Sequence, residues 1–141
     1  MNNFPIRIFV YSSLRSGFQH AAYEYISKYF TLETEAYTKG KLFDLGNNIV
    51  GIPVAENYFI KGELYVIKNQ DDFSWALAQL DDYEGIQNDE EEKPLYVRQT
   101  TTVYFGNLQK EQAWVYWFNQ PVNDGLFIES GDILAYLQDK K

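Results

Sequence analysis

Residues Ala113-Trp114-Val115-Tyr116-Trp117-Phe118 decide the fold, because all six side chains are apolar or aromatic. Successive side chains of a β-strand point to opposite faces, so the odd-numbered residues share one face and the even-numbered residues share the other. A strand that is apolar on both faces must be covered on both sides. The stretch, extended back to Gln112, is therefore predicted to be an interior strand or one wall of a barrel.

The rest of the chain supplies neighbours for this strand. Further strands are expected at Ile6–Tyr11, at Thr31–Leu45 with a break at Gly40, at Phe59–Ile67 and at Tyr96–Phe105, and Ile49–Pro53 is interpreted as an edge strand or a loop. Residues 106–110 predict a hairpin. Helical periodicity occurs at about residues 18–29, 71–83 and 131–138. These elements predict one α+β domain, residues 1–141, in which five to seven strands curl into a small barrel with two or three helices.

The composition excludes several classes of function. Twelve basic and twenty acidic side chains give a net charge of −8, which disfavours binding to nucleic acid or to an anionic membrane. The chain has no cysteine, so disulfides, thiolate catalysis and zinc–thiolate sites are absent. Residues 1–5 lack the features of a signal peptide, and no apolar run is long enough to span a membrane. We therefore expect a soluble, cytoplasmic protein.

The sequence Leu80-Asp81-Asp82-Tyr83-Glu84-Gly85 marks the end of the helix predicted at residues 71–83. Asn69 can cap the start of this helix, and Gly85 is a natural stop. Phe73, Leu77 and Leu80 form one apolar stripe, which reaches Glu84 when it is continued by four residues.

Glu84 is consequently a carboxylate in an unfavourable place. Partial burial disfavours its charged form, and so does the negative end of the helix dipole, so we expect a raised pKa. A carboxyl group whose pKa lies nearer neutrality can take and return protons. The alternative is a frayed last turn with Glu84 in solvent.

Other kinds of site have weaker signals. His20 is the only histidine, which excludes a multi-histidine metal cluster, and no Gly-x-Ser-x-Gly turn surrounds Ser12 or Ser13. Residues 88–94 lack the pattern of a calcium loop, and no phosphate-binding glycine motif is present. Arg15 and Arg98 can each clamp a carboxylate or form a surface ion pair. We predict no metal site and no cofactor.

The small-residue loop at residues 12–17 joins a strand to a helix, an arrangement that leaves backbone N–H groups free for a carboxylate or an oxyanion. This loop and four other motifs, in order along the chain, resemble the γ-glutamylcyclotransferase-like (AIG2-like) family. The motifs are Val10-Tyr11-Ser12-Ser13-Leu14-Arg15-Ser16-Gly17, Phe43-Asp44-Leu45-Gly46, Gly62-Glu63-Leu64-Tyr65, Leu80-Asp81-Asp82-Tyr83-Glu84-Gly85 and Tyr96-Val97-Arg98.

The resemblance implies a small mixed β-barrel flanked by helices. It implies release of 5-oxoproline from a γ-glutamyl amino acid, peptide or amine, with Glu84 as the catalytic general acid and base. Backbone N–H groups of Tyr11, Ser12, Ser13 and Leu14 would bind the substrate carboxylate or the oxyanion, and Tyr96 would form a wall of the pocket. The expected partner is this small-molecule substrate, and the oligomeric state is left open.

Ser12 departs from the family pattern, which has glycine after the tyrosine. A side chain at this position obstructs a positive φ angle or a close approach of the backbone to a ligand. Two alternatives to the enzyme therefore stay open. One is an inactive small-molecule binding or interaction module on the same fold, and the other is a structural domain with an exposed aromatic patch.

Overall fold

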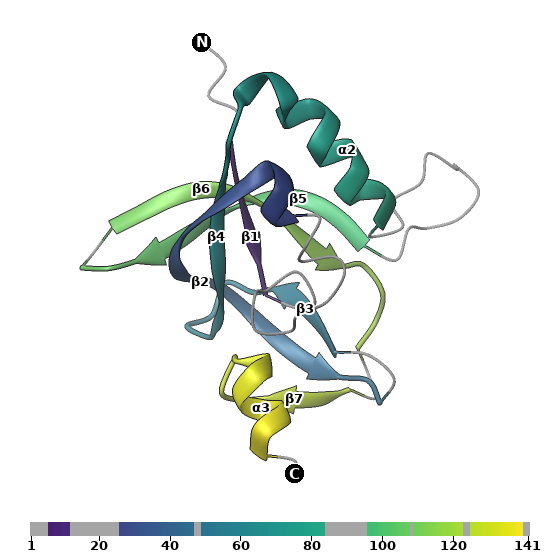
Figure 1. The fold of residues 1–141 in the computed structure, drawn as a ribbon. Helices are drawn as coiled ribbons and strands as arrows, with labels where there is room; N and C mark the ends of the chain where they lie inside the picture. The colour runs from purple at the N-terminus through teal and green to yellow at the C-terminus, as the bar shows by residue number, and fades with distance from the viewer. Residues whose placement is uncertain are drawn as a thin grey trace.

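A computed structural model describes residues 6–11, 26–46, 49–83, 96–107, 109–122 and 125–139. The strands are β1 (Arg7–Val10), β2 (Phe30–Asp44), β3 (Ile49–Pro53), β4 (Phe59–Ile67), β5 (Tyr96–Phe105), β6 (Gln109–Phe118) and β7 (Leu126–Ile128). Neighbouring strands follow the order β2–β4–β1–β6–β5, and β5 pairs again with β2, so that five strands close a barrel (Figure 1). The β1–β6 pair is parallel and the other pairs are antiparallel. The predicted α+β fold with a small mixed barrel is confirmed.

Strand β2 is the longest of the described strands and holds the additions to the barrel. Its C-terminal half pairs with both β3 and β7, which lie outside the closed ring. The expected break at Gly40 is wrong, because β2 continues through this residue. A Cβ atom at Gly40 would lie 2.7 Å from Ile60 Cδ1 and 2.8 Å from the Ile52 carbonyl oxygen. Glycine thus allows close packing here and does not interrupt the strand.

The other strand predictions agree closely with the structure. Strands β4 and β5 have the predicted bounds, and Ile49–Pro53 is an edge strand. The hairpin between β5 and β6 turns at Gly106, whose φ angle is +58°, and β6 begins at Gln109, three residues before the predicted start. The three-residue β7 was not predicted.

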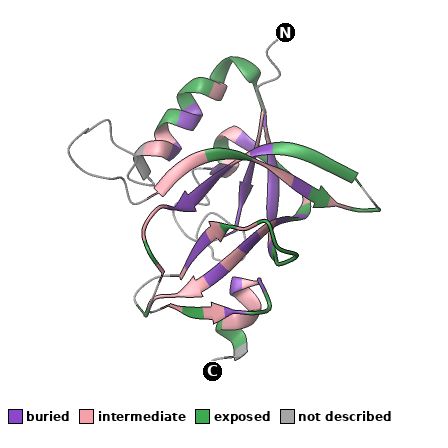
Figure 2. Cartoon of the chain, turned by 180° about the vertical axis from the view of Figure 1, so that it is seen from behind, coloured by how far each residue is buried: buried purple, intermediate pink, exposed green. Residues whose placement is uncertain are grey.

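Strand β6 separates two apolar clusters, as its sequence predicts. Alternate residues Ala113, Val115 and Trp117 belong to the cluster inside the barrel, and Tyr116 belongs to the second cluster, on the outer face. The first cluster consists of Phe9, Tyr11, Ala36, Leu42, Ile60, Leu64, Val103, Ala113, Val115, Trp117, Ile128 and Ile133. The second consists of Ile8, Val10, Ile26, Phe30, Tyr65, Ile67, Ala76, Leu80 and Tyr116. Figure 2 shows the buried parts of the barrel strands in purple.

Helix α2 (Phe73–Tyr83) covers the outer cluster. A short 3₁₀ turn, η2 (Gln70–Asp72), leads into it, and the Asn69 side chain accepts a hydrogen bond from the Asp71 backbone N–H, which confirms the predicted cap. The predicted stripe is buried at Leu77 and Leu80 and half-buried at Phe73.

Two further helical segments are described. Residues 26–29 form helix, within the segment predicted at about 18–29, and α3 (Ile133–Asp139) agrees with the predicted C-terminal helix. Helices α2 and α3 lie at opposite ends of the molecule (Figure 1). Among the described helices, none has the length and apolar character that a membrane span requires.

Candidate functional site

The predicted site is only partly within the described residues. Tyr11 and Tyr96 are described, whereas Glu84 and residues 12–14 lie outside the described ranges. The structure describes the segments that precede these positions: β1 and Tyr11 before residue 12, and α2 up to Tyr83 before Glu84. We call these two segments, with the residues that hold them, the frame of the site.

Tyr11 has its side chain in the barrel core. Its hydroxyl donates a hydrogen bond of 2.6 Å to the Tyr116 carbonyl oxygen, and its ring lies 5.9 Å from the Trp117 ring. Gly51 makes room for it, because a Cβ atom there would lie 2.8 Å from Tyr11 Cε2. The phenol therefore anchors the chain just before the predicted amide loop. A ligand-binding role of the Tyr11 backbone N–H stays a prediction.

Tyr96 is the first residue of β5 and is half-buried. It is paired with Phe118 across the β5–β6 ladder, and the two rings are 5.6 Å apart at an interplanar angle of 68°. An edge-to-face pair of this kind holds the tyrosine ring in one orientation. Its predicted role as a wall of the substrate pocket is not decided by these contacts.

Asp81, in the last described turn of α2, connects the Leu80–Gly85 motif to the barrel. Its Oδ1 atom accepts a hydrogen bond of 2.7 Å from the Tyr116 hydroxyl and lies 2.9 Å from Arg98 Nε. Tyr116 and Arg98 are directly opposite each other on β6 and β5, so both reach the same carboxylate from the outer face of the barrel. Only 20% of the Asp81 side chain is exposed.

Arg98 links this carboxylate to an aromatic ring. Its guanidinium carbon lies 4.8 Å from the centre of the Trp114 ring, a distance at which cation–π attraction operates. Its Nε atom is in ionic contact with Asp81, although the N–H is not aimed along the line that joins the two atoms, and this nitrogen is buried. Of the two functions considered for Arg98, the ion pair is the one that the structure shows.

Glu63 is a buried carboxylate that the sequence motif contains but that we did not single out. It lies on β4 directly opposite Val10 of β1, and 7% of it is exposed. Its Oε1 atom accepts a hydrogen bond of 3.0 Å from the Tyr65 hydroxyl. An acidic residue inside a predicted strand, two residues before a tyrosine on the same face, was the available signal, since a buried charge requires partners. Glu63 is therefore part of the frame on the β1 side.

The family comparison agrees with this distribution of motifs. The family model described as gamma-glutamyl cyclotransferase, AIG2-like, matches residues 8–135. The chain belongs to this family. The resemblance of its motifs is thereby confirmed, and the match includes both the end of β1 and the end of α2.

Solved structures share the fold of this AIG2-like chain. YkqA from Bacillus subtilis superposes with a TM-score of 0.68 at 22% sequence identity, over 98% of this chain and 44% of YkqA, so the chain spans less than half of that protein. The uncharacterized protein PH0828 from Pyrococcus horikoshii gives 0.64 at 18% identity, over 96% of both chains. Protein ytfP from Escherichia coli gives 0.61 at 29% identity, over 92% of this chain and 97% of ytfP. No curated protein matches the sequence.

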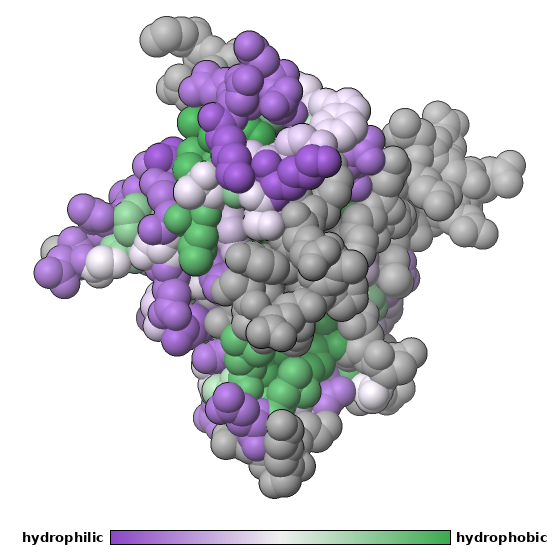
Figure 3. Space-filling model, in the orientation of Figure 1, coloured by the Kyte–Doolittle hydropathy of each residue, from purple (hydrophilic) through white to green (hydrophobic). Residues whose placement is uncertain are grey.

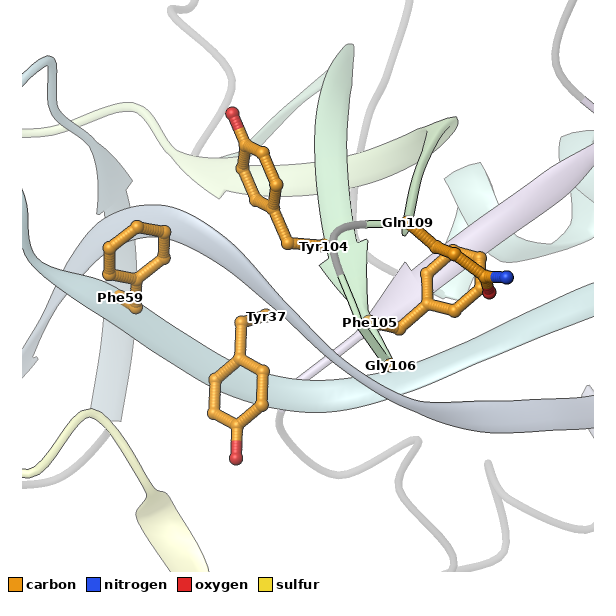
Figure 4. Close-up of a pocket in the computed structure, with 6 residues that line it drawn as sticks. All are labelled: Tyr37, Phe59, Tyr104, Phe105, Gly106 and Gln109. Atoms are coloured by element: carbon orange, nitrogen blue, oxygen red, sulfur yellow. The ribbon is translucent and has the colours of Figure 1, made fainter.

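The AIG2-like chain also has an apolar hollow of about 480 Å³, which is lined by residues other than those of the candidate site. Figure 4 shows its lining, which comes from β2, β4, β5, β6 and the hairpin turn: Tyr37, Phe59, Tyr104, Phe105, Gly106 and Gln109. Tyr37 and Phe59 are 42% and 40% exposed. Tyr104 is eight residues along β5 from Tyr96, about 26 Å at the usual rise of a strand. The hollow is therefore separate from the candidate site.

The described surface has a further hydrophobic region. In the view of Figure 3, hydrophobic residues gather in the lower part, where α3 and β7 lie in Figure 1. Within the described ranges, no three His, Asp or Glu side chains are grouped so that they could hold a metal ion.

Proposed function

We propose that this protein releases 5-oxoproline from a γ-glutamyl amino acid, peptide or amine, and that Glu84 is its general acid and base. The observation that supports the proposal is the family match over residues 8–135, with Asp81 of the Leu80–Gly85 motif bound to the barrel three residues before Glu84. The substrate's α-amine attacks its own γ-carbonyl carbon, a C–N bond closes the five-membered ring, and the bond to the departing amine breaks.

The reaction places modest demands on the protein. The nucleophile belongs to the substrate itself, so catalysis requires mainly that the substrate be held in a folded conformation. Glu84 takes a proton from the α-amine and gives it to the departing amine, which balances the reaction without a cofactor. Backbone N–H groups of residues 11–14 stabilise the oxyanion, and the buried Tyr11 side chain fixes the start of that loop.

The experiment is mass spectrometry of 5-oxoproline after incubation of the purified chain with a panel of γ-glutamyl amino acids, peptides and amines. We expect product from at least one class, at a rate proportional to the protein concentration. The absence of product from every class would contradict the proposed activity.

A second candidate, favoured by Ser12, is an inactive module that binds γ-glutamyl compounds. It predicts binding by calorimetry without product, both in the wild type and in Ser12→Gly. Formation of 5-oxoproline by the wild type would exclude an inactive module. If only Ser12→Gly forms 5-oxoproline, an inactive module is excluded for that variant alone.

We extend the proposal to a cytoplasmic location, since a chain without cysteine fits a reducing compartment. Cell fractionation tests it, and recovery of the protein in a secreted fraction would contradict it.

A further inference from the structure

We infer that Asp81 is a positioning residue, whose contacts with Tyr116 and Arg98 set the place at which the chain leaves α2 toward Glu84. The inference rests on the proposed function, in which Glu84 handles the protons. Asp81 lies in the last described turn of α2, and Glu84 follows Tyr83, the last described residue of this helix, in the sequence. A displacement of the last turn is therefore transmitted directly to Glu84 through the backbone.

Apolar packing alone does not fix the last turn along the helix axis. Leu80 and Ala76 pack on the outer cluster, but contacts of this kind are non-directional. A hydrogen bond to a carboxylate is directional and short, and Asp81 Oδ1 receives one of 2.7 Å from the Tyr116 hydroxyl. The same hydroxyl lies 3.5 Å from the Leu77 carbonyl oxygen, one turn earlier. Tyr116 thus contacts α2 at two successive turns.

The sheet side of this contact is buried, and its strand is paired on both edges. Tyr116 is 5% exposed and lies in β6, which pairs with β5 on one side and with β1 on the other. The Arg98 guanidinium is held against the Trp114 ring, so its position does not depend on Asp81 alone. Asp81 therefore joins the last described turn of α2 to an interior strand of the barrel.

The molecule provides a matched control for this contact. At the opposite end, the Tyr136 hydroxyl of α3 donates a hydrogen bond of 2.7 Å to Asp44 Oδ2 of β2. The donor, the acceptor, the distance and the partial burial are the same as for Tyr116 and Asp81. Tyr116→Phe and Tyr136→Phe each remove one hydroxyl and change no charge, and each removes a hydrogen bond between a helix and the barrel, at α2 and at α3 respectively.

The activity test compares these two variants at a temperature well below the unfolding midpoint of each. Tyr116→Phe is expected to lower kcat for 5-oxoproline release about tenfold with little change in KM, because small displacements of a catalytic group cost this much or more. Tyr136→Phe should retain wild-type kcat. Arg98→Lys, which keeps the charge but loses the planar fork, should act in the direction of Tyr116→Phe. Equal kcat values for the two Tyr→Phe variants would overturn the inference.

A second readout does not depend on activity. The NMR signal of the Glu84 carboxyl carbon is assigned as the signal that is missing in Glu84→Gln. Its chemical shift is then followed against pH in the wild type and in both Tyr→Phe variants. Tyr116→Phe releases the end of α2 and should therefore shift the pH midpoint of the Glu84 signal. Tyr136→Phe should leave this midpoint unchanged. If the wild type releases no 5-oxoproline, the proposed function fails, and an unmoved midpoint in Tyr116→Phe would separately contradict the positioning role.

Discussion

Helices α2 and α3 are each attached to the barrel by a tyrosine–aspartate hydrogen bond of 2.7 Å, yet the two bonds have different surroundings. At α2 the carboxylate of Asp81 also faces Arg98, a cation held on the sheet. At α3 the carboxylate of Asp44 also accepts the Gly46 backbone N–H, so it stabilises a turn of its own strand end. The Tyr116–Asp81 bond thus joins α2 to a charged face of the sheet. The Tyr136–Asp44 bond instead joins α3 to an aspartate that also stabilises a local turn.

The largest effect is expected at the start of α3. A Cβ atom at Gly131 would collide with the Phe59 carbonyl oxygen, and the φ angle of +70° disfavours any other residue. Gly131→Ala should therefore lower the free energy of unfolding by about 3 kcal/mol, measured by urea denaturation. Gly46→Ala, with φ +97° and no atom within 4 Å, isolates the backbone cost of about 1 kcal/mol. Equal losses in both variants would show that the contact with Phe59 is not tight.

The next largest effect separates the two aspartates. Asp81→Ala should cost about 2 kcal/mol, because Tyr116 and the buried Arg98 Nε both lose their carboxylate. Asp44→Ala should cost about 1 kcal/mol, since the exposed Gly46 N–H can bond to water. Denaturation measures both losses, and only Asp81→Ala should also lower the rate of 5-oxoproline release. A larger loss for Asp44→Ala would reverse the comparison.

The two Tyr→Phe variants should have similar stability. Each removes one hydrogen bond to a partly buried carboxylate, so each should lower the free energy of unfolding by about 1 kcal/mol. Urea denaturation checks this, and equal stability would mean that a difference in kcat reflects the position of α2. A loss in Tyr116→Phe several times that in Tyr136→Phe would instead attribute the activity change to unfolding.

The smallest effect is expected at an ion pair between β1 and β2. Arg7 Nε lies 2.7 Å from Glu33 Oε1, and this hydrogen bond raises the pKa of Arg7. A raised pKa adds stability that is fully present below the ordinary pKa of an arginine side chain and is lost only as the pH rises through the folded-state value. Glu33→Gln should thus lower the free energy of unfolding by about 0.5 kcal/mol at neutral pH, and by less at high salt. Arg7 should add no pH dependence to this loss between about pH 6 and 9. A loss independent of salt would contradict this account.

The barrel could be predicted from the sequence because local pattern and burial agree there. The two apolar faces of Ala113–Phe118 correspond to two clusters, and β4 and β5 have the expected bounds. Strand β7 could not be predicted, because three residues give no periodicity and its pairing with β2 is set by tertiary contact. The expected break at Gly40 was wrong for a related reason, since only the approach of Ile60 and Ile52 reveals why glycine is needed.

The candidate site was predictable in its motifs but not in its contacts. Asp81 stood in the quoted motif, yet its binding by Tyr116 and Arg98 depends on a β5–β6 register that the sequence does not specify. The burial of the Tyr11 phenol depends in the same way on Gly51 of β3. Long-range packing thus decides which motif residues hold β1 and α2 in place. The role of Glu84 remains a prediction from the family.

The most direct test of the central claim is the rate of 5-oxoproline release by Glu84→Gln, measured beside Glu129→Gln, which changes an exposed carboxylate in a turn before α3. The account predicts that Glu84→Gln folds with wild-type stability and releases no product above background, while Glu129→Gln turns over as the wild type does. Turnover by Glu84→Gln at the wild-type rate would remove the carboxylate after α2 from the reaction.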